Sequence, residues 1–133
     1  MRQAIMVEGA ARPAGGYSHA VLANGFIYVA GQGPAHPSTG VIPDGFADQV
    51  RQTLENLRLV LRGTGVDLAD VVKVNTYLSD LTRFAEYDAI YREFFPTEPP
   101  ARTTIGCQLK AIQVEIDCIA VAPTDNRPPV TAR

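Results

Sequence analysis

The 133-residue sequence has no tryptophan, two cysteines and two histidines. Because CxxC and HExxH patterns are missing, His19 and His36 do not suggest a zinc site, and we expect neither a metal nor a cofactor. Cys107 and Cys118 lack a motif-like spacing, which favours small buried hydrophobic residues in a reducing compartment. No segment approaches the roughly 18 apolar residues needed to span a bilayer. The first ten residues also lack the apolar core of a signal peptide, so we expect a cytoplasmic protein without membrane contact.

The sequence also lacks a large net charge of either sign. The formal charge of −2 and the pI of about 5.6 come without a cluster of Lys or Arg, which argues against a nucleic-acid partner. A content of 46% hydrophobic and 20% charged residues is typical of a globular protein. Residues 1–122 are therefore predicted to form one domain. Residues 123–133 lack periodicity and are predicted to form a flexible C-terminal tail.

The pattern of apolar residues predicts strands and two helices. Apolar residues at helical spacing predict helices over residues 46–62 and 82–95, with Asp44 and Thr82 as their N-caps. The aromatic residues of the second helix are expected in the core. Asn24-Gly25 between two apolar runs predicts a hairpin with a type I′ turn. Strands are predicted over residues 3–8, 18–23, 26–31, 71–78 and 114–121.

Two amphipathic helices can cover only one face of a sheet. The other face is expected to mix polar and apolar side chains, namely those of Lys73, Asn75, Tyr77, Glu115, Asp117, Ile119 and Val121. Such a surface suits contact with a second copy of the chain, so we predict an oligomer with closed symmetry. The alternative is a monomer whose half-exposed sheet faces water.

Residues 99–121 carry the candidate chemistry. Arg102 follows Pro99 and Pro100, which hold the backbone extended. In the strand over residues 114–121, Glu115 and Asp117 alternate with apolar residues. If this strand pairs back near Arg102, a guanidinium and a carboxylate share one site. That site is either a ligand site or a structural ion pair of Arg102 with one of the two carboxylates.

Seven segments taken together resemble the RidA family, also called the YjgF or L-PSP family. They are GGYSHAV at 15–21, VAGQGP at 29–34, ENL at 55–57, VVKVNTYLSDL at 71–81, FAEYDAIYREFF at 84–95, PARTT at 100–104 and VEIDCIAV at 114–121. The resemblance implies a chorismate-mutase-like α+β fold, a mixed β-sheet with two helices packed on one face. It also implies a homotrimer with a central barrel and with ligand clefts between subunits.

The resemblance further implies hydrolytic deamination of reactive 2-imino or enamine acids to 2-oxo acids and ammonia, a form of metabolite damage control. Arg102 corresponds to the arginine that binds the substrate carboxylate, through a planar fork that lysine cannot reproduce. Glu115 corresponds to the carboxylate that directs the attacking water. Tyr17 corresponds to an aromatic ring supplied by a neighbouring subunit. Further substrate contacts are expected from Ala30, Gly31, Asp88 and Thr104.

Several residues depart from the family pattern. Gly16 replaces a frequent proline, Ala30 a common serine, and Asp88 a common asparagine, which adds negative charge if it faces the cleft. The segment between Arg102 and Glu115 is shorter than usual. A non-catalytic ligand-binding or chaperone-like trimer is therefore the alternative to a deaminase. Ribonuclease activity is attributed to some relatives. This sequence has neither a basic patch nor an acid-base pair of histidines that would support it.

Overall fold

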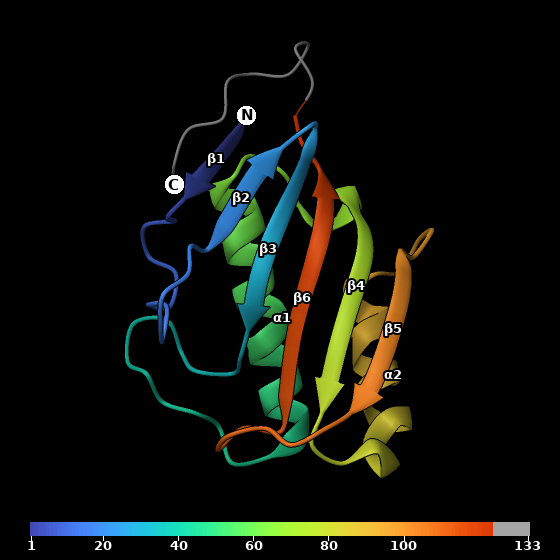
Figure 1. Ribbon diagram of the computed structural model, residues 1–133. Helices are drawn as coiled ribbons and strands as arrows, with labels where there is room; N and C mark the ends of the chain where they lie inside the picture. Colours follow the sequence, from blue (N-terminus) through green and yellow to red (C-terminus); the bar gives the residue numbers. More distant parts are fainter. Residues whose placement is uncertain (124–133) are drawn as a thin grey trace.

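The computed structural model describes residues 1–123, so the predicted tail beyond Pro123 lies outside the described residues. One mixed six-stranded sheet carries two helices on the same face (Figure 1). The spatial order is β1-β2-β3-β6-β4-β5, with β4 and β5 parallel and the other neighbours antiparallel. The strands are β1 (Arg2–Ile5), β2 (Ala20–Ala23), β3 (Phe26–Gln32), β4 (Val71–Leu78), β5 (Ala101–Gly106) and β6 (Val114–Val121). The predicted α+β fold is confirmed.

Both predicted helices form, but their N-caps were wrong. Helix α1 (Phe46–Gly63) begins after Gly45, whose position has no side-chain cap, rather than at a cap by Asp44. Before α2 (Phe84–Phe94), the chain makes a 3₁₀ turn, η2 (Leu81–Arg83). The carboxylate of Asp80 caps that turn by accepting hydrogen bonds from the backbone and hydroxyl of Thr82. A second 3₁₀ turn, η1 (Leu68–Asp70), leads into β4.

The predicted hairpin is confirmed as β2 and β3. Asn24 and Gly25 have φ angles of 49° and 83°, the left-handed values that a type I′ turn requires. The predicted bounds of β4 are also confirmed. The alternation of Val72, Val74 and Leu78 with Lys73, Asn75 and Tyr77 predicts that the three apolar residues share the buried face, and for Val72 this prediction is wrong. A register shift between Val71 and Lys73 leaves Val72 exposed, while Val74 and Leu78 are fully buried.

The core lies between the sheet and the two helices. Residues of β6 alternate as predicted: Val114, Ile116, Cys118 and Ala120 face the helices, and Glu115 and Asp117 face the open side of the sheet. Of the α2 aromatics, Tyr87 and Tyr91 are buried, but Phe84 is 38% exposed. None of the helices in residues 1–123 has the length and apolarity to cross a membrane.

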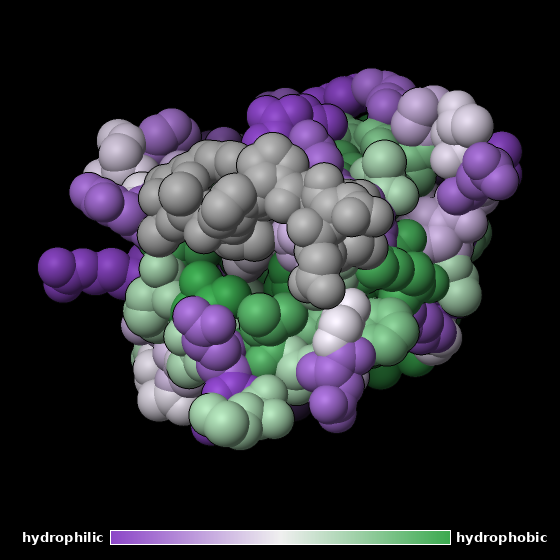
Figure 2. Space-filling model, turned by 90° about the horizontal axis from the view of Figure 1, so that it is seen from above, coloured by the Kyte–Doolittle hydropathy of each residue, from purple (hydrophilic) through white to green (hydrophobic). Residues whose placement is uncertain are grey.

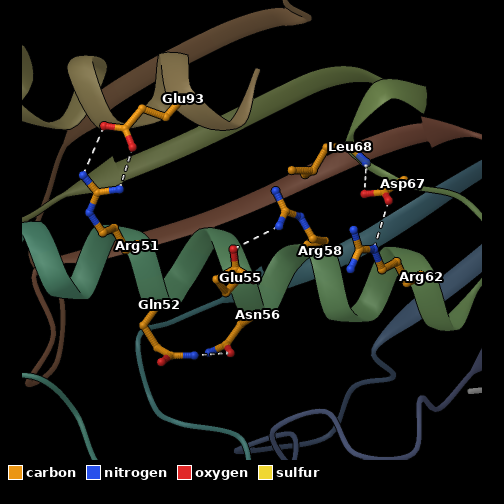
Figure 3. Close-up of polar contacts among 9 residues, drawn as sticks. All are labelled: Arg51, Gln52, Glu55, Asn56, Arg58, Arg62, Asp67, Leu68 and Glu93. Carbon is orange, nitrogen blue, oxygen red and sulfur yellow. Dashed lines mark hydrogen bonds and ion pairs between the residues drawn. The ribbon is translucent and has the colours of Figure 1, made fainter. Parts of the chain in front are cut away.

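The outer surface of α1 carries ion pairs (Figure 3). Arg51 points toward Glu93 of α2 and donates two hydrogen bonds to its carboxylate, of 2.7 and 3.1 Å. Along the same helix, Arg58 pairs with Glu55, and Arg62 pairs with Asp67, the N-cap of η1. Of the ion pairs within residues 1–123, the pair of Arg51 and Glu93 is the one that joins the two helices.

The open side of the sheet exposes apolar side chains between polar ones. Phe26 and Val121 are partners in register and are 39% and 37% exposed. Tyr28, Val72 and Ile105 are also exposed. Seen from the end of the sheet that holds the β2–β3 turn, apolar residues lie next to hydrophilic ones on the visible surface (Figure 2). The mixed polar and apolar character of the open face is what the sequence predicts for an oligomer contact.

Candidate functional site

Arg102 and Glu115 lie on opposite faces of the sheet. Strand β4 separates β5 from β6, so the two residues do not face each other across one strand pair. Arg102 is in register with Val74, which is buried beneath the helices. Glu115 is in register with Tyr77, on the open face. Because register partners point to the same face, the guanidinium and the carboxylate belong to two separate places in one chain.

The Glu115 carboxylate rests against the backbone of Gly31. A Cβ added at Gly31 would lie 2.5 Å from Glu115 Oε2 and 3.0 Å from its Cδ, so glycine alone leaves room for the carboxylate. The Glu115 carboxylate comes this close to Gly31 where the pairing of β3 with β6 has a register shift between Val29 and Gln32. The shift and the missing side chain together place Glu115 at the end of β3.

Tyr17 joins Gly31 and Glu115 in one hollow of about 210 Å³, here called the Glu115 hollow. The Tyr17 ring is 46% exposed, and its hydroxyl accepts a 2.9 Å hydrogen bond from the backbone of Ala14. The family resemblance implied that a neighbouring subunit supplies Tyr17, whereas Tyr17 and Glu115 line one hollow of the same chain. Ala30 precedes Gly31 on β3 and is half-buried, but it is not among the residues that line the hollow.

His19 holds the loop that presents Tyr17, a role that the sequence analysis missed. Its buried ring accepts a 2.8 Å hydrogen bond at Nδ1 from the backbone of Val7. Its Nε2 lies 2.7 Å from the carbonyl oxygen of Ala11, so the second nitrogen carries the proton and donates it. A histidine directly before a strand was the signal available in the sequence.

The two carboxylates of β6 have different surroundings. Asp117 accepts hydrogen bonds from Asn75, at 2.9 Å, and from the Tyr77 hydroxyl, at 2.8 Å. The hydrogen bond to Asp117 raises the pKa of Tyr77 to about 12. No protein hydrogen bond to the Glu115 carboxylate is found within residues 1–123. Burial raises the pKa of Glu115, and the negative charge of Asp117 raises it further. Glu115 is therefore available to a ligand or a water, and its burial favours the uptake of a proton.

Arg102 lies on the helix side, above the aromatic residues of α2. Its guanidinium carbon is 4.4 Å from the centre of the Tyr91 ring and 5.4 Å from the centres of the Phe84 and Tyr87 rings. These rings support the planar guanidinium through cation–π contacts. Thr104 is in register with the buried Thr76, so it points to the same side as Arg102.

The ion-pair partner of Arg102 is Asp88, not Glu115 or Asp117. Arg102 Nη1 lies 2.9 Å from Asp88 Oδ1, and both side chains are about one-fifth exposed. The same carboxylate holds Arg92, whose Nε is 2.9 Å from Oδ2. The sequence analysis missed Arg92, although its position four residues after Asp88 on a helix was a usable signal. Although burial opposes it, the pair with Asp88 raises the pKa of Arg102.

These three charged residues line a second hollow of about 490 Å³, here called the Arg102 hollow, whose remaining walls are Tyr91, Phe95, Pro96, Pro99 and Pro100. One chain thus carries two separate candidate sites. The Glu115 hollow offers a carboxylate and a tyrosine ring, and the Arg102 hollow offers a cation for an anionic group. In the part of the chain that the structure describes, no group of three or more His, Cys, Asp or Glu residues could hold a metal ion.

Comparisons with known proteins agree with this fold. The profile of the family described as Endoribonuclease L-PSP matches residues 8–122. A RutC family protein of Pyrococcus horikoshii is 41% identical over 123 residues, covering 90% of this chain and 98% of its own length. A rat protein named 2-iminobutanoate/2-iminopropanoate deaminase is 36% identical over 124 residues, covering 91% and 90%. The crystal structure of Escherichia coli TdcF with bound serine has a TM-score of 0.85 and 29% identity, covering 91% of this chain and 99% of that one.

Proposed function

The chain belongs to the Endoribonuclease L-PSP family, the family that its sequence segments resemble, and from this premise we propose that it hydrolyses reactive 2-imino acids to 2-oxo acids and ammonia. The observation that carries the proposal is the Glu115 carboxylate, which lies against Gly31 beside Tyr17 with its pKa raised by burial. An imine carbon is already electrophilic, so its hydrolysis needs a positioned water and a modest general base. The rat relative named as an imine deaminase supports the same chemistry.

In the proposed reaction, Arg102 binds the substrate carboxylate and Glu115 positions a water. As the water oxygen bonds to the imine carbon, Glu115 accepts one of its protons. Glu115 then gives this proton to the nitrogen, and the carbon–nitrogen bond breaks as the hydroxyl of the intermediate becomes the carbonyl. The hydroxyl proton passes to the departing ammonia, so that an iminium and water give a ketone and ammonium. Tyr17 and the backbone of Gly31 line the side from which the water approaches. Arg102 orients the substrate and takes no part in the proton transfer.

The proposed site forms between subunits. Because Arg102 and Glu115 lie on opposite faces of one sheet, they can act on one small molecule if the Arg102 hollow of one subunit meets the Glu115 hollow of its neighbour. Arg102, Asp88 and Thr104 then come from the first subunit, and Tyr17, Gly31 and Glu115 from the second. A homotrimer with three such sites satisfies this requirement with closed symmetry. Its contacts would cover the apolar side chains exposed on the open face.

The activity is tested by generating 2-iminobutanoate with a dehydratase and following the formation of 2-oxobutanoate. The wild type is expected to accelerate hydrolysis, and Arg102→Ala and Glu115→Gln are expected to remove most of the acceleration. A wild type that leaves the spontaneous rate unchanged with every imine tried would refute the deaminase and favour ligand binding without catalysis. TdcF, crystallised with bound serine, gives that second function its support.

The shared site is tested by mixing two inactive variants. When Arg102→Ala and Glu115→Gln subunits assemble at random in equal amounts, about a quarter of the subunit contacts join an intact arginine to an intact glutamate. Co-expression is therefore expected to restore about a quarter of the wild-type rate, although each variant alone is inactive. If one subunit supplied both residues, no mixture would recover activity, and the proposed arrangement would be wrong.

Ribonuclease activity has little support in the described residues. The His19 ring is buried, and both of its nitrogens already have backbone partners. His36 lies in a loop, where its Nδ1 contacts Ser38. The two histidines therefore do not form the acid-base pair that cleavage of RNA would need.

A further inference from the structure

The Arg102 hollow contains its own carboxylate. Asp88 contacts Arg102 through Oδ1 and Arg92 through Oδ2, each at 2.9 Å. The hydrogen bond from Arg92 lowers the pKa of Asp88, burial opposes this, and the contact with Arg102 lowers it further. Asp88 therefore stays ionised at neutral pH, and the hollow holds two fixed positive charges and one fixed negative charge.

A ligand carboxylate that binds Arg102 must lie close to Asp88. Both carboxylates would contact one planar guanidinium, whose nitrogens are only a few ångströms apart. Asp88 and Arg102 are each about one-fifth exposed, so water screens the repulsion between the two anions incompletely. A plain anion meets this repulsion in full. A ligand that carries a cationic nitrogen next to its carboxylate can turn that nitrogen toward Asp88 and offset it.

We propose that Asp88 determines specificity by making the Arg102 hollow select ligands with a carboxylate and a cationic nitrogen on the adjacent carbon, over 2-oxo acids. This inference rests on the proposed function, because it assumes that Arg102 binds the ligand carboxylate. The favoured class includes 2-iminium acids and 2-amino acids. Arg92 donates a hydrogen bond to the second oxygen of Asp88.

The selection has a consequence for turnover. Hydrolysis converts a 2-iminium acid and water into a 2-oxo acid and ammonium. The organic product keeps its carboxylate but loses the positive charge that faces Asp88. Its affinity falls at the step that forms it, so the product leaves readily and inhibits weakly.

The test compares 2-aminobutanoate with 2-oxobutanoate, which share a carbon skeleton, by isothermal titration calorimetry. The wild type is expected to bind 2-aminobutanoate about tenfold or more tightly, as expected for one uncompensated like-charge contact in a partly screened site. Asp88→Asn is expected to lose this preference, chiefly through tighter binding of 2-oxobutanoate. Glu86→Gln is the matched control, because it removes a negative charge of the same helix that pairs with Arg83 outside the hollow. It is expected to keep the wild-type preference.

The outcomes separate this inference from the proposed function. If Arg102→Gln abolishes binding of both ligands while wild type and Asp88→Asn show the same preference, Arg102 binds carboxylates but Asp88 does not select, and the inference is wrong. If Arg102→Gln leaves both affinities unchanged, the proposed carboxylate site is wrong and the inference falls with it. Thermal melting of each variant checks that a lost affinity is not a lost fold.

Discussion

The contact between Gly31 and Glu115 allows the proposed base to be displaced without touching its chemistry. In Gly31→Ala, the new Cβ would lie 2.5 Å from Glu115 Oε2 and 3.3 Å from its Cγ. Ordinary contacts between such atoms begin near 3.4 Å, so the carboxylate must move by about 1 Å. Glu115 is a flexible side chain and can swing away at little cost in stability.

A displacement of about 1 Å from a productive geometry costs about a hundredfold in rate. Gly31→Ala is therefore expected to lower kcat/KM for 2-iminobutanoate about a hundredfold, with a nearly unchanged melting temperature. Adding Glu115→Gln to it should cause little further loss, because both changes remove the same function. Gly45→Ala is the control, since its Cβ meets nothing closer than Asp48 Oδ2 at 3.8 Å, away from both hollows. If Gly31→Ala keeps the wild-type rate, Glu115 does not act from its observed position.

Three further changes are expected to give distinct results. The raised pKa of Glu115 means that the folded chain binds more protons than the unfolded chain just above the ordinary glutamate pKa, so its ionisation destabilises the fold as pH rises. Glu115→Gln should thus melt at a higher temperature than wild type at pH 7, with the difference gone below about pH 4, and the wild-type rate should fall on acidification at a pH above the ordinary glutamate pKa. Arg102→Lys should raise KM about tenfold to a hundredfold, because one charge-assisted hydrogen bond is worth about 1.5–3 kcal/mol. Gly63→Ala should lower the free energy of unfolding in urea by about 1–3 kcal/mol, because its Cβ would overlap the side chain of Val7.

The fold was predictable where short-range chemistry decides it. Asn24-Gly25 determines its turn by itself, and the helical and alternating patterns locate α1, β4 and β6 correctly. The errors lie where a local pattern competes with tertiary contacts. Val72 fits an alternating strand, but the register shift at its position turns it outward. The start of α2 was misplaced because a 3₁₀ turn capped by Asp80 precedes it.

The candidate residues were predictable as residue types, but their grouping was not. Arg102 and Glu115 are close in sequence, which suggested a shared site, whereas grouping depends on strand order. The insertion of β4 between β5 and β6 is a long-range choice that the sequence between them does not encode. The close approach of Glu115 to Gly31 depends in the same way on the pairing of β3 with β6.

The placement of Arg102 and Glu115 on opposite faces of the sheet also explains how one chain can hold both groups without pairing them with each other. A buried guanidinium and a carboxylate held close without a ligand would form an ion pair and occupy each other. Here Arg102 is balanced by Asp88 within its own face, and within residues 1–123 no ion pair of Glu115 is found on the other. Assembly would bring the two groups together across a gap that the substrate fills. Binding of the substrate carboxylate and activation of water would then both depend on the subunit contact, so the activity should disappear when the oligomer dissociates even though each subunit keeps its fold.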